Sequence, residues 1–336
     1  MIVLLFSVIA QAQIVNIPDA NFKNALVNNL CVDADEDGIF ESDVDINNDG
    51  EIQVSEAELV IKLKVEYDEI SSLEGIQSFS NLKSLQCKFN ELTSLDLSQN
   101  PDLEILTCYR NQLTNLNVSQ NPNLIILSCG NNQLTNLDVT QNPNLRILYC
   151  RVNQISHLNV SQNFELEELR CSLNQLTSID VTQNQNLKLL GCSDNQLTSL
   201  NINNGNNPNI DLIYTKNNPN LFCISVDDFE YANNQICNET DWSWCKDIWT
   251  EYSEECILGI PELNSIGINI FPNPVKDVLY ITSETPFDIL KIYNLQGQLI
   301  NETKNNQIDV SLFSSGLYFT SIVINGKNIV KKFIKD

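Results

Sequence analysis

Apolar positions in the middle of the chain recur with a period of 21 residues. One unit carries Leu103, Leu106, Cys108, Leu113, Leu116 and Val118. Alternation of apolar and polar residues predicts a short strand that turns Leu106 and Cys108 inward and their neighbours outward. One unit cannot bury its own apolar stripe, so we expect the units to stack into a solenoid with a parallel sheet.

Two polar columns share this period. Cysteines stand at Cys87, Cys108, Cys129, Cys150, Cys171 and Cys192, and an asparagine follows each of them three residues later. Neighbouring Cβ atoms in such a column would lie about 4.8 Å apart and parallel, beyond the usual reach of a disulfide. We therefore expect the thiols to be small apolar core residues, and the asparagine amides to satisfy buried backbone groups between turns.

The pattern Leu-x-x-Leu-x-Cys-x-x-Asn-x-Leu resembles the leucine-rich repeat, with Cys in the third Leu position. The resemblance covers residues 59–222 and gives eight turns, with a two-residue insertion near Gly205. A turn of 21 residues leaves little room for a convex helix, so extended or 3₁₀ segments closed by Asn-Pro corners at 100–101, 121–122 and 142–143 are expected. We predict a leucine-rich repeat solenoid, a horseshoe with a parallel β-sheet and little convex helix.

Residues 13–58 precede the repeats and predict a helical cap with a calcium loop. The EF-hand loop pattern places oxygen ligands at Asp45, Asn47, Asp49, the carbonyl of Glu51 and bidentate Glu56, with Gly50 at the sharp turn. A half-site at Asp33–Asp37 begins in the same way but has Val44 at position 12, which leaves its occupancy open. We expect one structural Ca²⁺ in the second loop; an acidic turn without metal is the alternative.

Residues 223–256 end the repetition and predict a C-terminal cap. All three tryptophans lie here, together with Cys223, Cys237, Cys245 and Cys256. Four cysteines allow three connectivities, of which we favour Cys223–Cys256 with Cys237–Cys245. Cys31 is then left over.

After a linker at 257–269, residues 270–336 alternate apolar and polar positions in runs about ten residues apart, which predicts a small antiparallel β-sandwich. The segments FPNPVKDVLYI, NLQGQLI and SSGLYF resemble the C-terminal sorting domain of the Bacteroidetes type IX secretion system. The resemblance implies engagement of that machinery, removal of the module, and release or attachment to anionic lipopolysaccharide. A sugar-binding sandwich is the alternative. The cap, the repeats and the calcium-loop segment look like secreted or surface leucine-rich repeat proteins of the same bacteria.

The first twelve residues predict a signal peptide. An apolar run of ten residues precedes Ala10-Gln11-Ala12, which has the small-x-small pattern of a cleavage site. The run is too short to span a bilayer, so no transmembrane helix is expected in the mature chain. A buried strand is the alternative, and the true start codon stays open because no basic residue precedes the run.

Charge and composition exclude several functions. The 336 residues carry 43 acidic and 19 basic side chains, a net charge of −24, which makes nucleic acid an unfavourable partner. One histidine in the whole chain excludes most acid–base and zinc chemistry. The assigned segments leave no room for a catalytic domain of about 100 residues, so we expect no enzyme.

Basic residues of the repeats fall in or beside the strand half, together with several tyrosines. We predict that Tyr109, Tyr149, Arg151, Arg170 and Tyr214 contact a protein or glycan ligand on the concave face, because Arg and Tyr are typical of recognition surfaces. The alternative is that these residues are solvated and balance an acidic protein. The sequence thus indicates an exported, non-catalytic binding or adhesion protein, or else a structural surface spacer without a ligand.

Overall fold

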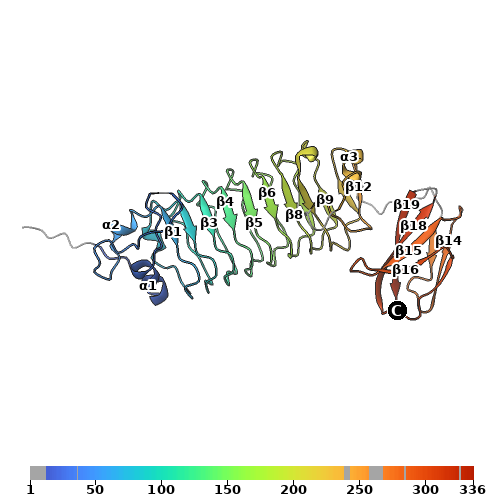
Figure 1. Cartoon of the computed structure of the whole chain (residues 1–336), viewed down its shortest axis with the longest axis horizontal. Coiled ribbons are helices and arrows are strands. Elements are labelled where there is room, and N and C mark those ends of the chain that lie inside the picture. Colours follow the sequence, from blue (N-terminus) through green and yellow to red (C-terminus); the bar gives the residue numbers. More distant parts are fainter. Residues whose placement is uncertain (1–12, 36, 238–242, 257–267, 284, 325–326) are drawn as a thin grey trace, which may run out of the picture.

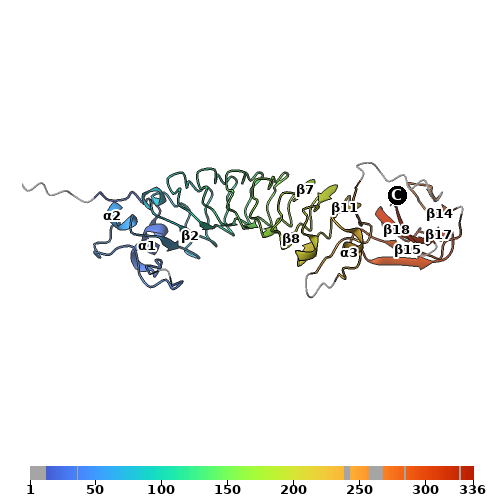
Figure 2. The ribbon, with the colours of Figure 1, turned by 90° about the horizontal axis from the view of Figure 1, so that it is seen from above.

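The computed structural model describes residues 13–35, 37–237, 243–256, 268–283, 285–324 and 327–336. The repeats wind into an elongated solenoid in which short strands lie side by side (Figures 1 and 2). They form one eight-stranded parallel sheet: β1 (Lys62–Lys64), β2 (Ser84–Gln86), β3 (Ile105–Thr107), β4 (Ile126–Ser128), β5 (Ile147–Tyr149), β6 (Glu168–Arg170), β8 (Leu189–Gly191) and β10 (Leu212–Tyr214). The predicted leucine-rich repeat fold is confirmed.

The register of this sheet stacks equivalent positions of successive turns. Leu106 of β3 pairs with Leu85 on one side and Leu127 on the other, and all three are buried. The six cysteines of the repeats are also fully buried, and none of them is in a disulfide. They therefore act as core residues, as the period predicted.

Asparagines three residues after the cysteines join neighbouring turns. The Nδ2 group of Asn111 donates to the carbonyl oxygens of Cys87 and Cys108, each at 3.0 Å, and its Oδ1 accepts the N–H of Leu92. The equivalent asparagines make the same type of contact. Each amide thus satisfies backbone groups from two turns that the core has removed from water.

A second asparagine column closes the opposite side of each turn. Asn121 is fully buried, and its Nδ2 donates to the carbonyl oxygens of Leu97 and Asn100 at 3.1 and 2.8 Å. The same arrangement recurs at Asn100, Asn142, Asn163 and Asn184. Asn100, Asn121 and Asn142 were expected only as corner residues before proline, and Asn163 and Asn184 were not predicted. The structure shows that the side chains of all five link neighbouring turns.

The convex side is mostly extended, as expected. Two 3₁₀ turns occur in the repeats, η1 (Ile76–Ser78) and η2 (Asn207–Asn209). Toward the C-terminal end the extended segments pair into a second parallel sheet, which the sequence analysis did not separate from irregular extended chain. Its order is β12 (Glu251–Ser253), β11 (Cys223–Ser225), β9 (Ser199–Asn201) and β7 (Ser178–Asp180).

The N-terminal cap contains helix α1 (Ala20–Asn28) and the single-turn helix α2 (Val54–Ala57). Phe22, Ala25 and Leu26 of α1 are buried against the solenoid core. Asp19 caps the helix by accepting the N–H groups of Asn21 and Phe22 through Oδ1. Its Oδ2 accepts three hydrogen bonds from the first turn of the repeats, so one carboxylate fixes the cap to the solenoid.

The C-terminal cap contains helix α3 (Phe229–Asn233) between β11 and β12. Disulfides join Cys223 to Cys256 and Cys237 to Cys245, the pairing favoured from the sequence. Trp244 is buried, and its Nε1 donates to the carbonyl oxygen of Ile210 at 2.8 Å. The cap therefore covers the last turn with aromatic area and a satisfied polar group.

The last module consists of two antiparallel sheets around their own core, which confirms the predicted small sandwich. One sheet contains β13 (Asn269–Phe271), β14 (Val278–Thr282) and β17 (Gln307–Asp309). The other contains β16 (Leu299–Thr303), β15 (Ile289–Tyr293), β18 (Gly316–Ile324) and β19 (Lys327–Lys335). The expected signal peptide and all but the last two residues of the expected linker lie outside the described residues.

Burial of the unpaired thiols predicts their reactivity. It raises the pKa of Cys31, Cys108, Cys150 and Cys192 to about 12, and raises the pKa of the remaining three well above the ordinary value. Since the thiolate is the reactive form, we expect a thiol reagent at pH 8 to label none of the seven in the native protein and all seven in urea. Rapid labelling of the native protein would contradict the buried column.

The Asp19 contacts predict the stability of the N-terminal cap. Asp19→Ala should lower the free energy of unfolding by about 1–2 kcal/mol, the usual effect of losing a helix cap, in urea titrations at pH 7. Asn24→Ala, on the exposed face of α1, is the control and should not destabilise the protein.

The same carboxylate predicts a pH dependence. Partial burial works to raise the pKa of Asp19, but hydrogen bonds from the Ser71 hydroxyl and from the N–H groups of Phe22, Ser71 and Ser72 outweigh it and hold the pKa below 3.8. Stabilisation is therefore present above pH 4 and is lost as the pH falls through the lowered value. The difference between wild type and Asp19→Ala should shrink there; a constant difference down to pH 2 would contradict this role.

Candidate functional site

We call the outward side of the eight-stranded sheet, including the residue before each strand and the three residues after it, the strand face. About half of its basic residues pair with acidic neighbours: Lys83 with Glu104, Lys88 with Glu66, and Arg146 and Lys188 with Glu167. The two cations beside Glu167 hold the pKa of that carboxyl below its usual range. For these residues the structure favours charge balance over ligand binding.

Three arginines of the strand face behave differently. Arg110, Arg151 and Arg170 form no ion pair within the part of the chain that the structure describes. Arg110 instead lies over the rings of Phe89 and Tyr109, 5.2 and 5.8 Å from their centroids. Arg151 and Arg170 are exposed and stand on adjacent turns toward the C-terminal end of the sheet.

These two arginines line a hollow of about 630 Å³ over β6, β8 and β10. Leu173, Leu212 and Tyr214 line it as well, so the hollow combines guanidinium groups with apolar walls. Ligand sites commonly show this composition, a mostly apolar lining with a few placed polar groups.

Arg170 contacts an aromatic ring on the preceding turn. Its guanidinium lies over the ring of Tyr149, 4.9 Å from the centroid, and the Tyr149 hydroxyl donates a short hydrogen bond to Glu168. Burial, together with this hydrogen bond, raises the pKa of Tyr149 to about 12. Glu168 accepts this hydrogen bond from the tyrosine and forms no ion pair with Arg170, whose side chain also lines the hollow.

Gly191 forms the floor of the hollow. It pairs with Arg170 on one side and with Tyr214 on the other, in a column that holds Tyr149 and Ser128 on earlier turns. A Cβ atom at Gly191 would meet only the Ser172 hydroxyl at 3.6 Å and the Arg170 side chain at 4.0 Å. The missing side chain, rather than a backbone requirement, therefore opens this space.

Of the five residues predicted to contact a ligand, four lie in or beside the hollow and one does not. Arg151, Arg170 and Tyr214 line the hollow, and Tyr149 lies beneath Arg170. Tyr109 is on an earlier turn, in an aromatic group with Phe89 and Tyr67.

Sequence analysis missed the apolar walls of the hollow. The first residue is apolar, outward and half-buried in five of the eight strands, at Ile105, Ile126, Ile147, Leu189 and Leu212, and the last two of these line the hollow. Each of these residues stands two positions before the last residue of its strand, which points outward. Side chains two apart in a strand lie on the same face, so the sequence contained this information. Gly191 was a second indication of the hollow, because it has no side chain in a column whose neighbouring turns hold tyrosines and an arginine.

In the loop at 45–56, the expected ligand residues are linked by hydrogen bonds from backbone N–H groups to the carboxylates. Asp45 accepts the N–H groups of Asp49 and Gly50, and Glu56 accepts those of Asn47 and Gln53. Gly50 has a φ of +80° at the sharp turn. The side chain of Glu51 pairs with Lys23 at 2.6 Å, outside the loop, which is consistent with a ligand role for its carbonyl alone.

Burial in this loop favours a bound cation. Asp45 and Glu56 are 3% and 6% exposed, and no ion pair to either is found among the described residues. Each carboxylate oxygen takes one N–H bond and keeps further lone pairs. Buried carboxylates without a cationic partner are costly, so the donor set fits a hard divalent ion such as Ca²⁺.

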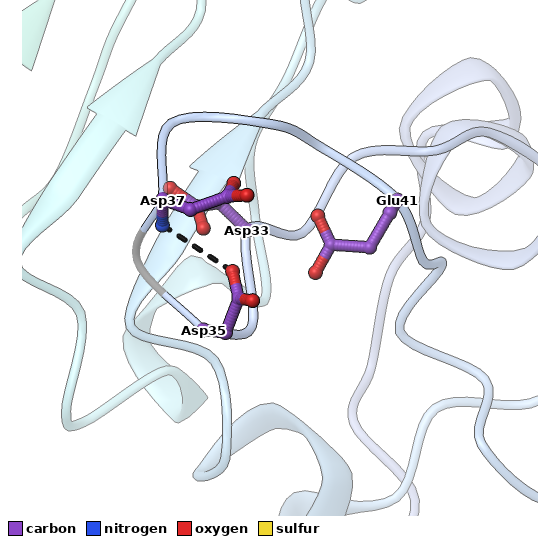
Figure 3. A group of neighbouring side chains, drawn as sticks. All are labelled: Asp33, Asp35, Asp37 and Glu41. Atoms are coloured by element: carbon purple, nitrogen blue, oxygen red, sulfur yellow. Dashed lines mark hydrogen bonds between the residues drawn. The ribbon is translucent and has the colours of Figure 1, made fainter.

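The carboxylates of the first acidic loop lie closer together than the sequence indicated. Oxygens of Asp33, Asp35, Asp37 and Glu41 lie within 4.8 Å of one another, the only group of at least three His, Cys, Asp or Glu ligand atoms that does so in the described ranges (Figure 3). The residue at position 9 explains why the first loop gathers four carboxylates and the second loop does not. It is Glu41 here, whereas in the second loop it is Gln53, whose amide lies between Asn47 and Asp49. Asp33 is also paired with Lys62 at 3.1 Å.

Comparison with known families identifies the last module. Residues 269–336 match the secretion system C-terminal sorting domain. This match shows that the chain carries an export signal of that class. Within the described residues, every helix is too short or too polar to cross a bilayer.

Solved structures support the fold of the repeats. Internalin C2 of Listeria monocytogenes is 22% identical, with 65% of this chain and 98% of that chain covered and a TM-score of 0.51. The functional domain of InlJ from the same organism, described as including a cysteine ladder, is 29% identical with a TM-score of 0.46. A leucine-rich repeat protein of Leptospira interrogans is 26% identical over 51% of this chain and 50% of that one, with a TM-score of 0.45.

The InlJ match covers 64% of this chain, which spans about half (52%) of the InlJ domain's length. No curated protein matches the chain. The likeness to internalin C2 shows the solenoid fold, and the ligand has to be argued from the chain's own surface.

Proposed function

We propose that this is an exported, non-catalytic binding or adhesion protein whose strand face holds a ligand in the hollow at Arg151 and Arg170. The observation that carries the proposal is the pair of arginines without acidic partners in a protein of charge −24. On the same face, four other basic residues are already neutralised by acidic neighbours. A structural spacer would need charge balance but no hollow with unpaired guanidinium groups.

The route of export belongs to the same proposal. The C-terminal sorting domain supports delivery by the type IX secretion machinery of a Bacteroidetes bacterium, after a signal peptide at 1–12 has led the chain across the inner membrane. The mature protein is then secreted or attached to the outer surface, where a protein or a glycan is the available ligand.

The binding proposal predicts the effect of charge reversal. An array of glycans and of bacterial and host surface proteins is probed with the full chain and with Arg151→Glu/Arg170→Glu. The variant should lose at least about 90% of the captured signal, because two attractive charges become repulsive. Lys83→Glu/Lys88→Glu changes the charge equally on the same face and should keep most of the signal. Equal capture by both variants and the wild type would overturn the proposal.

We also propose that Ca²⁺ binds the loop at 45–56 through Asp45, Asn47, Asp49, the carbonyl of Glu51 and Glu56, and stabilises the N-terminal cap. The buried carboxylates of Asp45 and Glu56 support this assignment. The loop lies between α1 and α2, so a bound ion would hold both helices against the first repeat.

Calcium removal tests this site. With a dissociation constant of about 10⁻⁴–10⁻³ M, as in extracellular modules, 10 mM Ca²⁺ should add about 1.4–2.7 kcal/mol to the free energy of unfolding. Glu56→Gln should abolish this gain, measured by urea titration with calcium and with EGTA. Glu41→Gln is the matched change in the first loop and should retain it. If only Glu41→Gln abolishes the gain, the ion binds the first loop instead.

A further inference from the structure

We propose that the ligand of the strand-face hollow is a peptide segment in which a carboxylate side chain lies next to an aliphatic or aromatic one. This inference rests on the proposed binding function and adds the chemistry of the partner. Three properties of the hollow support it: two guanidinium groups without acidic partners, an apolar wall beside them, and polar groups suited to a peptide backbone.

The charge of the hollow favours a carboxylate. The Arg170 guanidinium lies over the Tyr149 ring, and a guanidinium can offer two parallel N–H groups to one carboxylate. Arg151, on the preceding turn, supplies a second positive charge. The single acid in the lining, Asp194, already accepts a hydrogen bond from Asn217 at 2.8 Å. Two cations against one anion leave a positive site on a strongly negative protein.

The apolar part of the hollow favours a hydrophobic side chain next to that carboxylate. Leu173, Leu189 and Leu212 line the hollow, and Leu173 is 44% exposed. Leu173 therefore offers exposed apolar surface next to Arg170 and Arg151.

The same walls argue against a glycan. A sugar has less apolar surface to place against three leucines than an aliphatic or aromatic side chain has. A peptide offers both an apolar side chain for the leucines and backbone N–H groups for Asp194 and the serines at 172 and 193. A volume of about 630 Å³ accommodates two or three residues of such a segment.

Selection from a displayed library tests the inference. A random 12-residue peptide library is selected on the immobilised full chain and, in parallel, on Gly191→Phe, which fills the hollow where a Cβ meets no clash. The matched control Ser128→Phe adds the same ring to the same column, three turns away. Folding of each variant is verified by the absence of thiol labelling in the native state.

We expect the wild type and Ser128→Phe, but not Gly191→Phe, to enrich peptides with Asp or Glu beside Leu, Ile, Val or Phe. A peptide from this set, measured by fluorescence anisotropy, should bind Arg151→Gln/Arg170→Gln at least about tenfold more weakly. Replacing its acid by the amide should cost a similar factor. Lys83→Gln/Lys88→Gln, with the same loss of charge on this face, should bind like the wild type.

Other outcomes separate the two proposals. Enriched peptides that depend on Gly191 but lack an acid would overturn the ligand chemistry and leave binding at the hollow standing. The same holds if no peptide is enriched while oligogalacturonate, an anionic glycan probe, binds the wild type and not Gly191→Phe. Identical selection by the wild type and Gly191→Phe, with no glycan binding, would overturn both.

Discussion

Hydrogen bonds from buried asparagine side chains to the backbone of neighbouring turns are the constraint on which the solenoid depends. A 21-residue turn has two bends where carbonyl groups point away from the sheet and are covered by the core. One asparagine column satisfies the bend after the strand, and the other satisfies the opposite bend. Loss of either amide would leave buried carbonyls without partners, at about 1–3 kcal/mol each. The leucine and cysteine columns can pack only because these bends are closed.

The sequence was informative wherever the period repeats. The inward positions, the buried thiols and the eight turns follow from spacing alone, because a strand that alternates sides and a turn of constant length leave one arrangement. The second asparagine column was harder to predict, since proline follows Asn100, Asn121 and Asn142 and suggests a simple corner. Asn163 and Asn184 carried the decisive information: the asparagine persists where Phe164 and Gln185 replace the proline.

The candidate sites depend on departures from the period, which is why the sequence defined them less well. The hollow exists because Gly191 lacks a side chain between Arg170 and Tyr214, and its walls come from residues that elsewhere are merely half-buried. In the N-terminal cap, the EF-hand pattern located both acidic loops. It could not show that Glu41 turns toward Asp33, because that depends on the path of the chain between them.

The coexistence of two disulfides with seven buried thiols has a consequence for biogenesis. An exported chain meets oxidants before it is finished, and an unfolded cysteine with an ordinary pKa of about 8.5 is open to them. Seven of the eleven cysteines are protected from oxidation only after folding has buried them. The repeats must therefore fold faster than their thiols are oxidised. The two disulfides near the end of the repeats should form last, when the other thiols are buried and cannot mispair with them.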